Sequence, residues 1–335
     1  MSATNVTIHS SQFPENVRHD LFVSLLFRRV NHKFHYDSVK QTQKWLALHQ
    51  IYSPSRNDAD CRAIYKKGFK AVAERIEAKH VHVLGLGCGG GKKDTRLLKL
   101  LKARGREVFY TPCDVSLAMV LAARQSALMV LPEQNCFPFV CDLATPDDLS
   151  ADLNSQFTHR ASRVTTFFGM IPNFGPLAIM RQLTALLQPG ELLLFSANLA
   201  PGPDYAAGVK KILPQYDNAP TRDWLMTFLL DLGVQRRDGK LVFTVEAGEL
   251  DLKRVVVWFQ FRRPRRIEIE DETLSFKAGD SIRLFFSYRY TPERVRKILA
   301  GHGLEVCKQW IAKSGEEGVF LCQKLEGGAA APPDE

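Results

Sequence analysis

A short aliphatic run that enters a glycine-rich bend constrains this 335-residue chain more than any other segment. Residues 81–84 have the β-branched and aliphatic character of a buried parallel strand. A polar, helix-forming segment over 92–104 follows three glycines at alternate positions, Gly85, Gly87 and Gly89. Glycines permit a tight turn and the close approach of a ligand, and the next helix offers unpaired N–H groups. Strand, bend and helix therefore predict a nucleotide-binding corner of an α/β fold.

Carboxylates follow the next two predicted strands. The strand over 108–113 ends at Asp114, and the strand over 137–141 ends at Asp142, which Leu143 follows. A carboxylate at the tip of the second strand can accept hydrogen bonds from ribose hydroxyls, and one at the third can accept from an adenine amino group. A fourth strand ends at Gly169. We predict that these groups surround one nucleoside-containing ligand.

The glycine spacing G-L-G-C-G resembles the loop that binds S-adenosylmethionine (SAM) in class I methyltransferases more than it resembles the dinucleotide fingerprint. The resemblance implies SAM as the cofactor, bound by Gly85, Gly87, Gly89, Asp114, Asp142, Leu143 and Gly169. Methyltransferases usually carry an acid two residues before the first glycine, and this chain has Val83 there. The alternative is that the two acids are ordinary strand-end caps of a Rossmann-like domain.

Alternating strands and helices predict an α/β fold, a Rossmann-like class I methyltransferase core with an inserted α+β substrate-binding domain. An insertion late in such a sheet would lie over the carboxyl ends of the strands, where ligands bind. We expect a SAM-binding core at 76–198 and 286–325, an inserted substrate or lid domain at 199–285, an N-terminal helical part of the substrate domain at 1–75 and a disordered tail at 326–335.

The net charge of +9 raises the question of a nucleic-acid partner. The densest basic run is 262–266, between two predicted strands, where a solvated hairpin end is the alternative to phosphate binding. No aromatic-rich RNA-binding signature accompanies it, so we expect a small-molecule substrate and no nucleic acid.

No apolar run is long enough to span a membrane, and the first residues of the sequence lack a signal-peptide pattern. The seven cysteines form no C-x-x-C pair, which favours a reducing cytoplasm and no metal site. We expect a cytoplasmic protein; the sequence leaves the oligomeric state open, with a monomer favoured.

A second and more specific resemblance comes from five segments that occur in the expected order along most of the chain, at 34–37, 51–56, 167–174, 215–218 and 282–290. They resemble, respectively, the tyrosine-aspartate, "YYPTR", "FLGSTIGNF", "AYDD" and "RTEVSxKF" segments of one family. That family is the histidine-specific, SAM-dependent methyltransferases of ergothioneine biosynthesis, which make the Nα-trimethyl betaine of histidine. The third segment is one residue shorter here and contains Pro172.

The resemblance implies a role for individual residues. Asn173 would hold the substrate carboxylate or amine, and Tyr52 and Tyr216 would frame its amino-acid end; these are the candidate catalytic residues. Ser287 would line the side-chain pocket together with Tyr36. As alternatives, the two tyrosines could be helix-packing aromatics and Ser287 an ordinary strand residue.

The main departure from the family falls at Phe285, where the family has a glutamate that hydrogen-bonds the imidazole. Phenylalanine cannot accept a hydrogen bond, and the loss of that acceptor removes discrimination in favour of histidine. An aromatic or otherwise less polar amino acid, or a modified histidine, fits Phe285 better.

The sequence thus predicts a SAM-dependent N-methyltransferase that acts on the α-amino group of a free amino acid or close derivative, histidine-like or aromatic. One alternative is an RNA or protein methyltransferase that uses the basic hairpin. Another is a SAM-binding homologue without activity, which Val83, the shortened loop before Asn173 and Phe285 would favour.

Overall fold

The computed structural model describes residues 4–145, 149–155 and 161–326. Within them, the largest sheet has eight strands in the order β1 (Thr7–Ile8), β4 (Phe139–Val140), β3 (Glu107–Asp114), β2 (His80–Leu86), β5 (Ser162–Phe168), β6 (Leu192–Asn198), β13 (Glu317–Lys324) and β12 (Leu304–Ile311). Neighbours are parallel, except that β13 runs antiparallel to both β6 and β12. The strand order reverses at β2, the position at which doubly wound sheets bind ligands. The predicted Rossmann-like core is confirmed.

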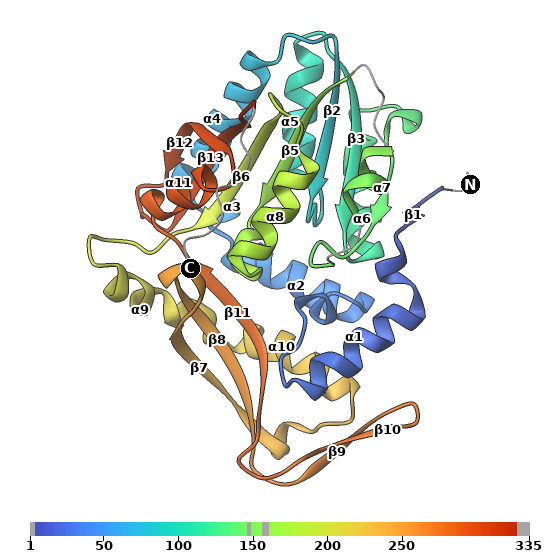
Figure 1. The fold of residues 1–335 in the computed structure, drawn as a ribbon, viewed down its shortest axis with the longest axis vertical. Helices are drawn as coiled ribbons and strands as arrows, with labels where there is room; N and C mark the ends of the chain where they lie inside the picture. The colour runs from blue at the N-terminus through green and yellow to red at the C-terminus, as the bar shows by residue number, and fades with distance from the viewer. Residues whose placement is uncertain (1–3, 146–148, 156–160, 327–335) are drawn as a thin grey trace.

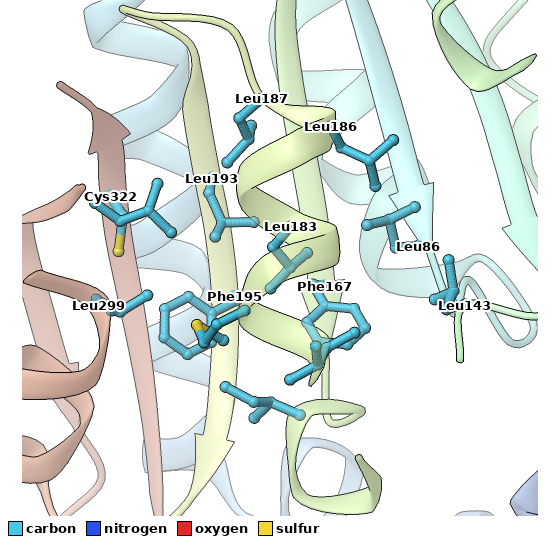
Figure 2. Packing of buried hydrophobic residues seen from close by; sticks show 14 of the residues in the cluster. Leu86, Leu143, Phe167, Leu183, Leu186, Leu187, Leu193, Phe195, Leu299 and Cys322 are labelled. Atoms are coloured by element: carbon cyan, nitrogen blue, oxygen red, sulfur yellow. The ribbon is translucent and has the colours of Figure 1, made fainter. Parts of the chain in front are cut away.

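Helices cover both faces of this sheet and form two hydrophobic clusters. One face carries α4 (Ala59–Arg75), α5 (Lys92–Ala103) and α6 (Leu117–Ala127), and the other carries α7 (Leu149–Ser155), α8 (Pro176–Leu186) and α11 (Pro292–Ala300). Figure 2 shows Leu183 of α8 near Phe167 and Phe195 of the sheet, whereas Leu186 lies nearer to Leu86 of β2. Each such side chain contributes about 1.5–3 kcal/mol when fully buried, so the strand ends that carry the site rest on a well-packed core.

A second unit lies beyond the carboxyl ends of the main strands (Figure 1). It contains an antiparallel sheet of β7 (Gly239–Ala247), β8 (Lys253–Phe261) and β11 (Ser281–Arg289), and a hairpin of β9 (Arg265–Ile269) and β10 (Glu272–Phe276). Its helices are α1 (Pro14–Leu26), α2 (Val39–Tyr52), α3 (Pro54–Asn57), α9 (Tyr205–Tyr216) and α10 (Ala219–Asp231). Side chains from the N-terminal segment and from the insertion share a third hydrophobic cluster, which includes Leu25, Trp224 and Phe285.

Three elements depart from the expected division into domains. Helix α4 lies before position 76, but its apolar stripe, including Val72, packs on the main sheet. Strand β1 also joins that sheet, through β4. Strand β11 pairs with β8 up to Arg289, so a division at residue 286 would cut one continuous strand. Of the expected disordered tail, residues 327–335 lie outside the described residues.

The basic run at 262–266 is partly neutralised inside the fold. Arg263 Nη2 lies 2.6 Å from Asp238 Oδ1, and Arg265 also forms an ion pair with this fully buried carboxylate. Burial raises the pKa of Asp238, but hydrogen bonds from Arg265, the Gln235 backbone and Arg263 outweigh it and bring the pKa to about 2. Two of the four arginines therefore serve the structure of this hairpin. Among the described helices, none has the length and apolar character needed to cross a membrane.

Candidate active site

A cavity of about 310 Å³ lies where the carboxyl ends of the central strands face the second unit. It brings together predicted residues that are widely separated in the chain. These are Tyr36, Tyr52, Gly87, Gly89, Asp114, Asp142, Leu143, Gly169, Asn173, Tyr216, Phe285 and Ser287. The lining includes every predicted site residue except Gly85.

Gly85 lies inside β2, behind the cavity. A Cβ atom at this position would lie 2.5 Å from Oδ2 of Asp94. That carboxyl group accepts hydrogen bonds from Tyr110 (2.7 Å) and Thr166 (2.8 Å), and its burial raises the pKa of Asp94. The structure therefore assigns Gly85 to the packing of this buried group and not to the cavity lining. Glycine spacing alone cannot separate the two roles.

The next two glycines form the bend itself. Gly87 and Gly89 have φ values of 56° and 51°, in the left-handed region that favours glycine. A Cβ atom on Gly87 would lie only 2.5 Å from Met170 Cγ. The N–H of Gly89 donates to Asp114 Oδ2 over 3.0 Å, so the bend and the tip of β3 are held together.

Asp114 presents a desolvated carboxyl group to the cavity. It accepts the backbone N–H of Gly89 and, over 3.1 Å, that of Ser116. Burial raises the pKa of Asp114 to about 6, although these backbone hydrogen bonds act in the opposite direction. A carboxyl group in this state gains from hydroxyl donors that replace the lost water.

Asp142 is held from the N-terminal segment. Its Oδ1 accepts the N–H of Ala144 over 2.8 Å, and its Oδ2 lies 3.4 Å from Asn31 Nδ2 and 3.3 Å from Lys33 Nζ. Lys33 is buried and belongs to a 3-10 turn over His32–His35. Sequence reasoning missed Asn31 and Lys33, because nothing local to either residue indicates a contact with a strand end so far along the chain.

A half-buried lysine also lines the cavity. Lys93 lies in the first turn of α5, where its Nζ donates to the Tyr65 hydroxyl over 2.8 Å and lies 4.2 Å from the centre of that ring. Burial lowers the pKa of Lys93, and the carboxylate of Glu317 raises it. Nothing in the sequence distinguishes Lys93 from the other lysines of this polar helix.

The substrate side of the cavity is mostly aromatic. Phe285 is only 8% exposed, and its ring centre lies 4.9 Å from that of His32, 5.9 Å from Trp224 and 6.1 Å from Tyr216. Among the described lining residues, the acidic side chains are Asp114, Asp142 and Glu317. Asp114 and Asp142 have the partners given above, and Glu317 accepts hydrogen bonds from the Tyr65 hydroxyl and the Cys61 thiol.

Strand β11 positions two of the candidate catalytic residues. Asn173, in the turn Ile171–Asn173, donates through Nδ2 to the carbonyl of Phe286 over 3.0 Å. The Tyr216 hydroxyl donates to Ser287 Oγ over 2.8 Å and accepts from Arg289 Nη2 over 2.7 Å. Arg289 is buried and was missed, because its role depends on the contact with α9.

The other two tyrosines approach the cavity from the N-terminal segment. Tyr52 ends α2 and is 48% exposed. Tyr36 packs between two tryptophans: its ring centre lies 5.7 Å from that of Trp45 and 5.6 Å from that of Trp224. Burial, followed by the negative charge of Asp114, raises the pKa of Tyr36, so its hydroxyl keeps its proton and can donate at neutral pH.

A comparison with known protein families identifies the family to which this chain belongs. A family model described as histidine-specific methyltransferase, SAM-dependent, matches residues 52–324. This chain belongs to that family. It is therefore a SAM-dependent methyltransferase, as the motifs predicted.

Two similar relatives are both named as N-methyltransferases. The histidine N-alpha-methyltransferase of Mycobacterium tuberculosis is 26% identical over 285 residues, which cover 82% of this chain and 83% of the relative. The N-methyltransferase imqF of Aspergillus flavus is 24% identical over 257 residues, 74% of this chain and 69% of the relative. SAM-bound CalS10, an amino pentose methyltransferase from Micromonospora echinaspora, aligns over 83% of this chain and 96% of its own, with 14% identity and a TM-score of 0.40.

Proposed function

We propose that this methyltransferase transfers methyl groups to the α-amino group of a free aromatic amino acid or a close derivative. The observation that carries the proposal is the wall formed by Phe285 with Trp224 and His32. Its aromatic faces offer apolar contact to a ring, and Phe285 provides no acceptor for an imidazole N–H. A modified histidine without that donor would also be accepted.

The cofactor end of the cavity fits SAM group by group. Lys93 would provide a half-buried cation for the amino-acid carboxylate, Asp114 would be a desolvated acceptor for the ribose hydroxyls, and Asp142 with Leu143 would contact the adenine. Gly87, Gly89 and Gly169 would let the ligand approach the backbone. When bound, SAM supplies an electrophilic methyl group on its sulfonium.

The residues opposite would orient the amine. An amino group with an ordinary pKa near ~8 must lose its proton before its lone pair can react. The Tyr216 hydroxyl donates its hydrogen bond to Ser287, so its oxygen can accept a hydrogen bond from a substrate N–H. Asn173 donates one amide N–H to the carbonyl of Phe286. Its second amide N–H and its carbonyl oxygen would bind the amino-acid end of the substrate. Tyr52 would provide a further hydroxyl.

The test is an acceptor panel with purified protein and SAM, in which methylated products are quantified by mass spectrometry. We expect kcat/KM for phenylalanine, tyrosine or tryptophan to exceed that for histidine by about tenfold or more. A preference for histidine would overturn the proposal. Saturable SAM binding without product from any amino acid would instead support the inactive homologue, and a labelled product only in RNA or protein would support the basic-hairpin alternative.

A further inference from the structure

A second cavity, of about 610 Å³, adjoins the active-site cavity. The two share five lining residues, which form the boundary between them: Asn31, His32, Leu143, Asn173 and Phe174. The remaining wall of the second cavity comes from the N-terminal segment, from α8 with the preceding Gly175, and from β11, with Ala144 and, on α7, Ser150. Whatever extends from the substrate past Asn173 would therefore enter this second cavity.

Three arginines line the second cavity, Arg29, Arg181 and Arg283, and its described lining contains no aspartate or glutamate. Arg29 and Arg181 are exposed and Arg283 is half-buried. The guanidinium of Arg283 lies over the ring of Phe286, 4.9 Å from its centre, and its buried Nε has no hydrogen-bond acceptor among the described residues. All three side chains thus present positive charge to one space.

The charges around Arg283 leave this positive potential uncompensated. Burial, followed by the charges of the neighbouring Arg254 and Arg29, lowers the pKa of Arg283 to about 10. Glu246 faces this region from β7, but it already accepts a hydrogen bond from Trp258 Nε1 (2.6 Å) and lies 3.8 Å from Arg254. Clustered guanidinium groups without carboxylate partners favour anions, which they bind with directed pairs of N–H donors.

We propose that this arginine-lined cavity binds an anionic group that extends from the carboxyl end of the methyl acceptor, past Asn173. The inference rests on the proposed function, which places the amino-acid end of the substrate at Asn173. The preferred acceptor is then an aromatic amino acid joined through its carboxyl to an acidic group, such as a short acidic peptide or a similar conjugate. The aromatic side chain lies against Phe285 and the distal carboxylate or phosphate lies among Arg29, Arg181 and Arg283.

The test compares two ligands that differ only in the distal charge. Calorimetry on the protein saturated with S-adenosylhomocysteine measures the Kd of phenylalanylglycine and of its neutral amide, phenylalanylglycinamide. We expect the acid to bind about tenfold more tightly or better, as for the loss of one hydrogen bond between charged groups. Arg283→Met and, on the exposed face of α8, Arg181→Met should reduce this preference to about twofold or less, because each removes a donor cation.

Arg266→Met is the matched control, because Arg266 is an exposed arginine on β9, outside both cavities. This variant should keep the full preference for the acid. Equal affinity of the wild-type protein for the two ligands, including no binding of either, overturns the proposal. So does a preference that survives in the Arg181→Met/Arg283→Met double variant.

Further outcomes show whether the anion is free or part of the substrate, and whether a failure concerns this inference or the proposed function. Inorganic phosphate that binds in an Arg283-dependent way, without any preference between the dipeptides, would mean that the cavity takes a free anion, and the substrate assignment would fall. If phenylalanine is methylated but the dipeptides bind equally, only this inference fails. If the acid is preferred but no amino compound is methylated, the proposed function fails and the anion site remains.

Discussion

The buried ammonium of Lys33 lies 3.3 Å from Oδ2 of Asp142, and it also contacts Asp20. This pair joins the N-terminal segment to the tip of β4, where the cofactor is proposed to present its adenine. The N-terminal segment packs with the insertion in one hydrophobic cluster. The pair therefore connects the substrate-side unit to the cofactor side of the main sheet.

Lys33→Met should weaken SAM binding by about tenfold, because it leaves Asp142 buried without its cationic partner. Calorimetric titration with SAM measures the effect. Lys40→Met is the control, since Lys40 pairs with Asp231 on the exposed surface, and such pairs contribute little to stability. An unchanged Kd in the Lys33 variant would show that the pair has no part in the cofactor site.

Asp114→Asn should stabilise the ligand-free protein near neutral pH while it weakens SAM binding. The pKa of Asp114 is raised from 3.8 to about 6 by burial, so the folded protein favours the protonated carboxyl group. Its contribution to stability is complete below pH ~4 and is lost as the pH rises through about 6. At about pH 7.5, the variant replaces a desolvated charge with a neutral amide.

Melting curves of the ligand-free protein at about pH 7.5 and pH 5 test this expectation. The variant should have the higher Tm at the higher pH, and the difference should shrink at the lower pH, where wild-type Asp114 is largely protonated. SAM affinity should fall about tenfold or more, from the loss of a charged acceptor. A lower Tm for the variant at both pH values would contradict the assigned pKa direction.

Phe285→Glu should shift acceptor preference toward histidine. The substitution introduces a carboxylate acceptor for an imidazole N–H into the aromatic wall, and sites that read such a donor discriminate strongly. We expect the ratio of kcat/KM for histidine to that for phenylalanine to rise about tenfold or more. Phe285→Gln, which accepts a hydrogen bond without charge, should give a smaller shift, and an unchanged ratio in both variants would remove Phe285 from the specificity pocket.

Tyr216→Phe should lower kcat/KM by about tenfold to a hundredfold without changing the Kd for SAM. The change removes the hydroxyl group that accepts a hydrogen bond from Arg289 and donates one to Ser287. It also leaves the buried Arg289 with fewer hydrogen-bond acceptors. Tyr205→Phe, the matched control, removes a hydroxyl that lies outside the cavity lining and contacts only backbone groups, those of Arg289 and Lys253. Equal losses of activity in the two variants would indicate that the role of Tyr216 is only structural.

The local pattern was sufficient for the core of the fold and for most of the residues that we propose for the cofactor side. A strand that leads into Gly87 and Gly89, and carboxylates placed directly after strands at Asp114 and Asp142, are features that neighbouring residues impose on each other. Parallel strands bring their carboxyl ends to one edge of a sheet. Residues with this placement therefore meet without any further information.

Other members of the site depended on contacts between distant segments. Lys33 reaches Asp142, Lys93 reaches Tyr65, and Arg289 reaches Tyr216 only after the sheet, the insertion and the N-terminal segment have packed together. In the sequence, each of these cations is one basic residue among many. The same holds for Gly85, whose glycine spacing is satisfied equally by ligand approach and by the packing of Asp94.

The sequence by itself thus determined the order of the elements, the glycine bend and the strand-end carboxylates, because these follow from backbone conformation and from short-range periodicity. Only the tertiary structure decided which charges are buried, which of them are paired and which surfaces enclose the cavities. The free energy of a charged group depends on the atoms that replace its water, and in this protein those atoms come from segments far away in the chain.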